Sequence, residues 1–455
     1  MSRKPPIPLP KRGAATKGAP GAFERALAFL RQGNLPQAHA LCERIISAQP
    51  RHALAWHLLG AIELQRGEPA LALRRFDSAL AIETGDAGMH NSRGNALVRL
   101  QRYEEALASL DRCLALQPRH AEAQHTRGGV LFRLARYEEA LAAFEGALAI
   151  EPGSVMTWNS HGSALVRLGR REAARESFRR AAELAPHHPL AHYNLGCVLG
   201  ELGQREAAVA CFERAVALEP RHAEAHNNLG VALAALGRCE AALVSHDAAV
   251  RLKPDVPENQ LNRGVTLERL GRHAEARECY EAAVARAPDN ARAHWNLALN
   301  CLLTGDFARG WEHFEWRWRY RRADEPCAQR PRWTGAEPLA GKTILLVAEQ
   351  GLGDTLQFCR YAALLAERGA SVVLCVPHPL VALLATLPGA PRVLAEGDPL
   401  PDFDYCCPMM SLPRAFGTTL ASIPGEVPYL SADPDKCAAW AARIGPREGL
   451  RAGLV

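Results

Sequence analysis

A glycine returns every 34 residues through the middle of the chain and constrains the fold more than any other feature of the sequence. The series is Gly60, Gly94, Gly128, Gly162, Gly196, Gly230 and Gly264. A fixed period of this length indicates a repeat architecture, in which each repeat is one small unit that packs on its neighbours.

Other residue types keep the same register. An alanine lies twelve residues after each glycine, an aromatic residue lies sixteen after most of them, and a proline closes most units. Gly and Ala suit the crossing point of two helices, because larger side chains would hold the backbones beyond roughly 8 to 10 Å. Proline ends a helix because it cannot donate the next hydrogen bond. Each unit is therefore predicted to be a hairpin of two helices.

The spacing of Trp56, Leu59, Gly60, Ala72 and Phe76 resembles the tetratricopeptide repeat (TPR) family. The resemblance extends over residues 21–324, with a degenerate first unit at 21–52 and an eighth clear unit at 291–324. It implies an α-helical solenoid, a right-handed superhelix whose concave surface, lined by the first helices of the units, binds a protein or peptide. A second glycine series is predicted to end those first helices in the left-handed conformation.

Four asparagines recur two residues before the glycine position: Asn194, Asn228, Asn262 and Asn296. An amide both donates and accepts, so a ladder of amides suits the backbone of an extended peptide. The TPR superhelix of the O-linked N-acetylglucosamine transferases carries such a ladder, and these four units resemble it. Hydrogen bonds to neighbouring turns are the other interpretation, and both stay open.

Charge and composition argue against a nucleic-acid-binding, a secreted or a membrane-spanning protein. The net charge of +5 is accounted for by five basic residues before position 18, so the body of the chain is near neutral and does not favour nucleic acid. We interpret residues 1–20 as a disordered basic leader, since they lack the hydrophobic segment of a secretory signal. No apolar run reaches the ~18 residues of a membrane span. Scattered cysteines favour a reducing cytoplasm.

Metal binding is not expected. The histidines His192, His226 and His294 lie one or two repeats apart, a separation on the order of 15 Å or more for stacked hairpins. A metal bound at about 2 Å cannot bridge that gap. No C-x-x-C pair is present.

A tryptophan- and arginine-rich segment follows the repeats. Residues 305–322 are predicted to form one helix with Trp311, Phe314 and Trp318 on a single apolar face. Aromatic residues mixed with arginine also suit stacking on nucleic-acid bases. We favour a helix that docks the solenoid onto the next domain, because an open repeat stack must cover its last apolar face.

Beyond a linker at 325–342, the period of 34 residues disappears. Residues 343–349, 371–376, 392–395 and 403–406 are predicted strands, with helices expected at 355–368 and 379–387. Alternating strands and helices indicate a doubly wound α/β fold with a parallel sheet.

The turn after the first predicted strand is the candidate site. Its residues are Glu349, Gln350, Gly351, Leu352, Gly353 and Asp354. Open α/β sheets place ligands at the carboxyl ends of their strands. The spacing differs from the dinucleotide fingerprint. Asp354 at a helix start is also a good N-cap, so a purely structural role is the other interpretation.

The region from Trp311 to Ser422 resembles bacterial TPR proteins related to glycosyltransferase families 9 and 41. The resemblance lies in the tryptophan-rich segment, in Glu349 to Tyr361, in Gly397 to Tyr405 and in Phe416 to Leu420. It implies that residues 343–448 form the Rossmann-like, N-terminal half of a GT-B glycosyltransferase. Asp354 is then the candidate base that deprotonates the acceptor hydroxyl, as proposed in the heptosyltransferases. Gln357, Arg360 and Tyr361 would contact the acceptor.

The same resemblance implies a second domain that binds the donor. Residues 449–455 are expected to be its first strand, with the rest absent from this chain. We therefore expect no cofactor on this chain and a nucleotide sugar, UDP-linked, in a complete enzyme. The two hypotheses are a TPR-containing glycosyltransferase and a non-catalytic TPR scaffold; an arginine-rich nucleic-acid binder is disfavoured. Self-association is common among TPR superhelices, so a homo-oligomer is possible.

Overall fold

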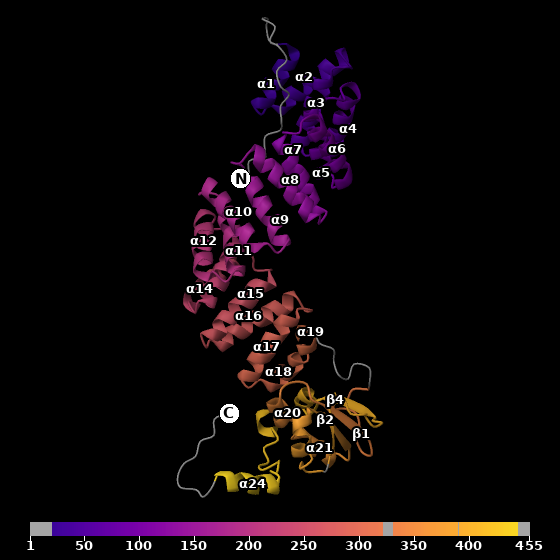
Figure 1. Ribbon diagram of the computed structural model, residues 1–455, viewed down its shortest axis with the longest axis vertical. Helices are drawn as coiled ribbons and strands as arrows, with labels where there is room; N and C mark the ends of the chain where they lie inside the picture. Colours follow the sequence, from indigo (N-terminus) through magenta and orange to yellow (C-terminus); the bar gives the residue numbers. More distant parts are fainter. Residues whose placement is uncertain (1–20, 322–330, 390, 445–455) are drawn as a thin grey trace. The chain divides into compact units, whose positions relative to one another are not determined.

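The computed structural model describes residues 21–321, 331–389 and 391–444, which fall into two compact units (Figure 1). The first unit ends at Arg238 and the second begins at Cys239. The predicted leader at 1–20, residues 325–330 of the predicted linker and the predicted strand at 449–455 lie outside the described residues.

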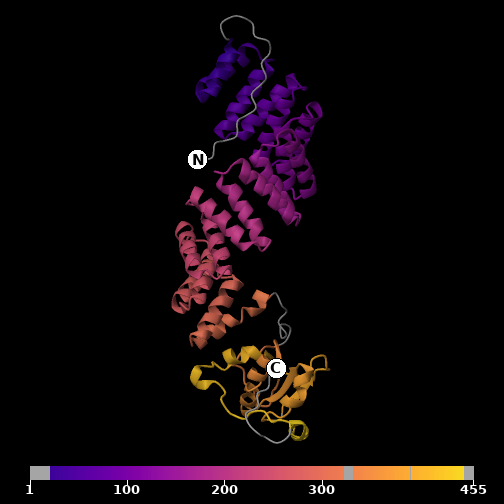
Figure 2. The same ribbon diagram turned by 60° about the vertical axis from the view of Figure 1, so that its left-hand side comes forward.

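The first unit consists of helices that pair as hairpins, and the turned view in Figure 2 shows the same pattern. Its helices are α1 (Ala22–Arg31), α2 (Leu35–Ala48), α3 (Ala53–Arg66), α4 (Pro69–Ile82), α5 (Ala87–Arg99), α6 (Tyr103–Leu116), α7 (Ala121–Arg133), α8 (Tyr137–Ile150), α9 (Val155–Arg167), α10 (Arg171–Leu184), α11 (Pro189–Glu201), α12 (Arg205–Leu218) and α13 (Ala223–Ala235). The predicted helical hairpins are confirmed, including the degenerate first one.

The periodic glycines lie where the two helices of a hairpin cross. A Cβ atom on Gly128 would lie 2.6 Å from Cε1 of Phe144, and one on Gly162 would lie 2.7 Å from Cε1 of Phe178. Both aromatic rings are buried. In these hairpins the glycine and the aromatic residue sixteen positions later therefore form one packing contact, which explains their common period; at Gly94 the partner is Leu110.

The turn after each first helix is left-handed, as predicted. Gly67 and Gly169 have φ angles of 86° and 74°. Two repeats lack a glycine at this place, and there Gln101 and Ala135 both adopt a φ of 59°. The hairpin geometry is thus kept even where the residue type does not favour it.

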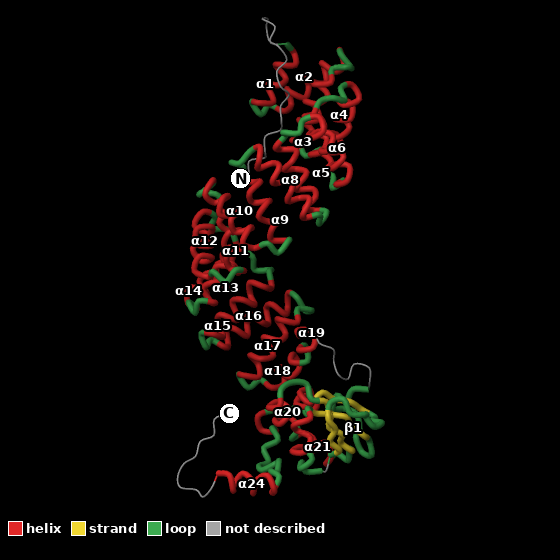
Figure 3. The backbone as a smooth tube through the Cα atoms, viewed as in Figure 1, coloured by secondary structure: helices red, strands yellow, loops and turns green. Residues whose placement is uncertain are grey.

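The second unit begins with further repeat helices and ends in an α/β region, where the helices of Figure 3 give way to strands. Its helices are α14 (Cys239–Leu252), α15 (Pro257–Arg269), α16 (His273–Arg286), α17 (Ala291–Leu303), α18 (Phe307–Phe314), α19 (Arg317–Arg321), α20 (Leu352–Phe358), α21 (Tyr361–Glu367), α22 (Val381–Leu384), α23 (Leu412–Ala415) and α24 (Pro434–Ile444). Three 3-10 turns are η1 (His378–Leu380), η2 (Met409–Ser411) and η3 (Leu420–Ser422).

The α/β region is built on a four-stranded parallel sheet of order β3-β2-β1-β4. The strands are β1 (Thr343–Val347), β2 (Ser371–Val376), β3 (Arg392–Ala395) and β4 (Tyr405–Pro408). The parallel sheet agrees with the prediction, and β2 and β3 have the predicted bounds. The predicted helix at 355–368 is instead two helices, α20 and α21, interrupted at Cys359 and Arg360.

The last repeat packs against the sheet region. Ala298 and Phe314 lie in one buried cluster with Ile344 and Leu346 of β1, which confirms the predicted docking role of the tryptophan-rich segment. The prediction of a single helix at 305–322 is wrong. The segment breaks into α18 and α19, because Trp316 N–H bonds to the carbonyl of His313 (3.1 Å), three residues back, and ends the α-helical ladder.

Candidate functional site

The first unit carries a groove of about 540 Å³ on the first helices of successive hairpins, which we call the helix groove. Ser92 and Asn95 of α5 and Thr126 of α7 line it, and Thr157 of α9 lies in its wall. Ser92 and Thr126 hold the places that asparagine takes in later repeats. The wall is therefore polar at the positions equivalent to those of the asparagine series, although the polar groups are hydroxyls.

Two arginines and two glutamates, Glu122 and Glu151, line the helix groove, so its charges balance. Arg99 and Arg133 lie exposed in the last turns of α5 and α7 and line the groove. His125 also lines it, and its Nδ1 lies 3.1 Å from the hydroxyl oxygen of Thr157. Burial lowers the pKa of His125, which favours the neutral imidazole. The guanidinium groups are the exposed cations of this wall.

The asparagine series lies in contact with neighbouring repeats. Asn194 donates through Nδ2 to Oδ1 of Asn159 (3.1 Å), and Asn228 donates to the hydroxyl of Tyr193 (3.3 Å). Oδ1 of Asn262 accepts from Arg292 (3.2 Å). Nδ2 of Asn296 is buried without a hydrogen-bond partner among the described residues. Three of the four amides thus bond within the protein, and peptide binding by this series stays a prediction.

The turn after β1 opens helix α20. Gly351 is the N-cap residue without a side-chain bond, and Asp354 lies within the first turn, partly exposed. The N-cap role considered for Asp354 therefore falls to Gly351. With its amide oriented to satisfy both neighbours, Gln350 donates to Oδ2 of Asp354 (3.3 Å) and accepts from Nη1 of Arg321 (3.3 Å).

A cavity of about 450 Å³ lies beside this turn, between α18, the α20 and α21 helices and the loop after η3. Gly353, Gln357, Arg360 and Tyr361, all predicted site residues, line it. Its other walls carry the rings of Phe307, Trp311, Phe358 and Tyr429. We call this cavity the aromatic pocket.

Hydrogen bonds fix the wall of the aromatic pocket. Arg360 donates through Nη1 to the carbonyl of Pro424 (2.9 Å), and its guanidinium lies 3.8 Å from the ring centre of Tyr429. The hydroxyls of Tyr361 and Thr418 lie 2.8 Å apart. Arg360 and Tyr361 thus hold the loop that closes the pocket.

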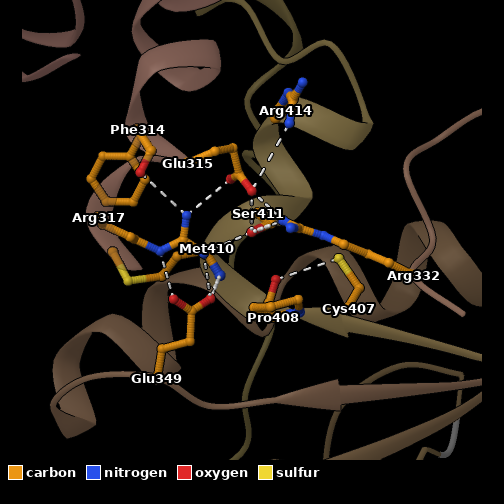
Figure 4. A network of polar contacts seen from close by, with 10 residues as sticks. All are labelled: Phe314, Glu315, Arg317, Arg332, Glu349, Cys407, Pro408, Met410, Ser411 and Arg414. Carbon is orange, nitrogen blue, oxygen red and sulfur yellow. Dashed lines mark hydrogen bonds and ion pairs between the residues drawn. The ribbon is translucent and has the colours of Figure 1, made fainter. Parts of the chain in front are cut away.

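The carboxylate of Glu349, a predicted residue of the ligand loop, bonds within the protein. It accepts from Nε (2.8 Å) and Nη2 (3.0 Å) of Arg317 and from the backbone N–H of Met410 (3.0 Å), as Figure 4 shows. Nη2 of Arg317 also donates to Oγ of Ser411 (2.7 Å). The side chains of Arg317 and Glu349 are 1% and 2% exposed.

This network fills the crevice where such sheets usually hold a ligand. The strand order reverses between β1 and β4, and Glu349 follows β1 while Met410 and Ser411 follow β4. Ligands of open α/β sheets bind at this switch point. Here the guanidinium of Arg317, from the last repeat, lies between the two loops, so the usual place is taken by the protein itself.

Opposed charges set the protonation of the network. Burial raises the pKa of Glu315, but the guanidinium groups of Arg317 and Arg332 outweigh burial and hold it below the ordinary value. Burial raises the pKa of Glu349 even though Arg317 and the N–H of Met410 favour its carboxylate. The bonds to Glu349 raise the pKa of Arg317, against burial, so the guanidinium stays charged. Glu315 is the acid that is held most firmly ionised.

Several functional residues were not predicted. The charged residues of the network other than Glu349, and the pocket residues Phe307, Thr418 and Tyr429, were not predicted as site residues, although Thr418 and Arg317 lie in segments of the glycosyltransferase resemblance. Arg317 lies inside the tryptophan-rich segment, so its place next to an expected interface was a usable signal.

No cluster of three or more metal-ligating side chains occurs within residues 21–321, 331–389 and 391–444. Among the described helices, none is long and apolar enough to cross a membrane.

Family models identify the repeats. A tetratricopeptide repeat model matches residues 23–87, 91–155, 193–257 and 261–315, and a second one matches 154–221. The matches of the first model alone cover more than half of the chain. The chain therefore belongs to the tetratricopeptide repeat family, whose stacked hairpins are protein-interaction scaffolds.

Individual relatives share parts of the chain. Protein FlbA of Caulobacter vibrioides is 28% identical over 174 residues, which span 33% of this chain and 29% of FlbA. YrrB, described as a TPR protein with an unusual peptide-binding site, is 29% identical with a TM-score of 0.37 and covers 40% of this chain and 95% of its own. PilF of Pseudomonas aeruginosa is 20% identical with a TM-score of 0.42, over 46% of this chain and 95% of its own.

Proposed function

We propose that this protein binds an extended segment of a partner protein in the helix groove, with carboxylates of that segment paired to Arg99 and Arg133. The observation that carries the proposal is the groove itself, with Arg99 and Arg133 exposed one repeat apart along a polar wall. Hydroxyl and amide groups suit a peptide backbone, and guanidinium groups form strong charge-assisted bonds with carboxylates. The family supports a protein or peptide as the ligand class.

The test is a charge reversal. Acidic peptides selected from a displayed peptide library are measured by fluorescence anisotropy against the protein and an Arg99→Glu/Arg133→Glu variant. We expect affinity to fall at least tenfold, because two charge-assisted bonds worth about 1.5 to 3 kcal/mol each become repulsions. Arg74→Glu, an exposed change on α4 away from the groove, is the control. Equal affinity in the double variant would place the peptide elsewhere.

The asparagine series lies outside the helix groove, and peptide binding by its amides is a separate proposal with its own test. Asn228→Ala and Asn262→Ala are expected to weaken binding of an extended peptide without unfolding the repeats. Circular dichroism monitors the fold and anisotropy the binding. Unchanged affinity would leave these amides with the contacts to neighbouring repeats that they already make.

A second candidate function is transfer of a sugar to the bound protein. It rests on the resemblance to glycosyltransferase families 9 and 41, and a parallel sheet with a Gly-Leu-Gly-Asp turn at the end of β1 is compatible with it. In this proposal the carboxylate of Asp354 takes the proton of an acceptor hydroxyl, whose oxygen attacks the anomeric carbon while the nucleoside diphosphate leaves. A UDP-linked sugar on a second domain would be the donor.

The transferase proposal is tested at Asp354. In a complete two-domain enzyme, Asp354→Asn is expected to abolish incorporation of labelled sugar from a UDP-linked donor while peptide binding persists. The exposed Asp402→Asn serves as the matched control. Sugar transfer that survives Asp354→Asn, or a complete enzyme that binds no nucleotide sugar by calorimetry, would leave the scaffold function alone.

A further inference from the structure

The aromatic pocket is lined largely by aromatic rings and has the size of a small-ligand site. Five rings line it, from Phe307, Trp311, Phe358, Tyr361 and Tyr429, and they come from a repeat helix, from α20 and α21 and from the closing loop. Its volume of about 450 Å³ falls in the range of small-ligand sites. Ring pairs such as Trp311 and Phe358, with centres 6.1 Å apart at 86°, already show the edge-to-face packing that a further ring could join.

The pocket wall also holds a polar group without a partner. Nε1 of Trp311 is buried and has no hydrogen-bond partner among the described residues. A buried N–H without an acceptor is costly and uncommon. Trp311 lines the pocket with other parts of its ring, and its N–H is covered by neighbouring groups, so a turn of the indole is needed to present this donor to a ligand.

Charge narrows the ligand class. Among the described lining residues the one ionised side chain is Arg360, and its guanidinium is already bonded to Pro424 and stacked on Tyr429. A phosphate would need more cationic donors than this wall offers. The exposed amide of Gln357 can pair with a peptide backbone. The pocket therefore suits an uncharged ring next to a peptide carbonyl.

We propose that the aromatic pocket binds an aromatic side chain of a partner peptide, and that the indole of Trp311 turns on binding to donate its N–H to a carbonyl oxygen of that peptide. Aromatic anchors seated in desolvated pockets carry much of the affinity of protein interfaces. The inference rests on the proposed peptide-binding function, and it adds an anchor site within the second unit. It needs neither the arginines of the helix groove nor the catalytic role of Asp354.

The experiment follows indole signals in ¹H–¹⁵N spectra of the whole chain during titration with N-acetyl-phenylalaninamide at millimolar concentration. Trp311→Phe and Trp318→Phe assign two signals and form a matched pair, because both indole nitrogens are buried and unpartnered while Trp311 alone of the two lines the pocket. We expect the Trp311 signal to shift saturably and the Trp318 signal to stay. Trp311→Phe should weaken binding about three- to tenfold, the effect of one lost hydrogen bond.

Further arms make each outcome decisive. Ile423 lines the pocket and is 47% exposed, so Ile423→Trp can fill the mouth without disturbing the core, and it should abolish the shift. N-acetyl-alaninamide should give no saturable shift. The inference is overturned if the Trp311 signal stays fixed, if the alanine amide acts equally, or if uridine shifts it and the aromatic amide does not. Equal affinity of acidic peptides for the parent and for the Arg99→Glu/Arg133→Glu variant would overturn the groove proposal and leave this one intact.

Discussion

Arg317 carries its charge into an interior where 1% of its side chain is exposed, and such burial is costly unless the donors are matched by acceptors. Glu349, Glu315, Ser411 and the carbonyl of Phe314 supply those acceptors. The pairing is specific in direction, because a bidentate guanidinium requires a carboxylate placed in its plane. This one side chain therefore aligns the last repeat with the loops after β1 and β4.

Removing that guanidinium should strongly destabilise the fold. We expect Arg317→Met to lower the free energy of unfolding by about 3 to 5 kcal/mol, because it leaves buried carboxylates unpaired. Adding Glu349→Gln should restore part of the loss. Denaturant unfolding measures both, and Arg319→Met, at a 67% exposed side chain, is the control with little expected change. If Arg317→Met lowered the free energy of unfolding only slightly, water would have replaced the guanidinium as the partner of the carboxylates.

A second residue-scale prediction concerns His57 in the first unit. Its Nε2 lies 2.9 Å from Oγ of Ser92, and burial lowers the pKa of its imidazole from 6.5 to about 4. A depressed histidine pKa stabilises the fold above the unfolded value and loses that contribution as pH falls from about 6.5 towards 4. The loss should reach about 3 kcal/mol. In urea unfolding, the free energy of unfolding of His57→Gln should depend less on pH than that of the parent. Parallel curves for the two proteins would contradict the role of His57. His188→Gln, at an exposed histidine, controls for the substitution itself.

At the scale of the element, the hairpin tolerates residues that its turn disfavours. Ala135 adopts a φ of 59° after α7, where Gly169 adopts 74° one repeat later. A left-handed backbone costs a residue with a Cβ about 1 to 2 kcal/mol. The packing of the two helices therefore imposes the turn, and the glycine found in other repeats relieves the strain.

Ala135→Gly should consequently raise the free energy of unfolding by roughly 0.5 to 1 kcal/mol, the strain relief less the entropy cost of glycine. The reverse change, Gly169→Ala, should cost about 1 kcal/mol, and it meets no atom within 4 Å, so its effect is confined to the backbone. Ala142→Gly, exposed within α8, controls for glycine entropy and should destabilise. Destabilisation by Ala135→Gly would contradict the strain.

The sequence predicted those structural features that depend on contacts between residues close together in the chain. The glycine period predicted the hairpins because most of these glycines meet an aromatic residue only sixteen positions away. The left-handed turn at Ala135 had no such signal, because alanine gives none. The partners of Arg317 lie 32 and 94 positions away at Glu349 and Ser411, and no short motif encodes a pairing of that range. Sequence placed Gln357, Arg360 and Tyr361 on one helical segment near a site, whereas the closing loop with Tyr429 came from the structure.

At the scale of the whole molecule, a repeat array is stabilised by contacts between neighbours, and its last repeat needs a cover. In the second unit the sheet region provides that cover, since Phe314 is 4% exposed within the cluster that also holds the core of β1. The sheet region is thus part of the folding unit of α17, α18 and α19. The repeats of the first unit do not depend on it for their own hairpin contacts.

A chain ended after Arg321 tests this dependence. Hydrogen exchange should become faster in α17, α18 and α19, because Phe314 and the guanidinium of Arg317 lose their buried partners. The exposed apolar face should also cause association that depends on concentration, visible by light scattering. Exchange in α1 to α12 should stay the same, and a chain ended before Pro434, which removes the exposed helix α24 and the residues after it, should behave as the parent. Unchanged protection of α17 to α19 in the shorter chain would show that the last repeat is stable without the sheet.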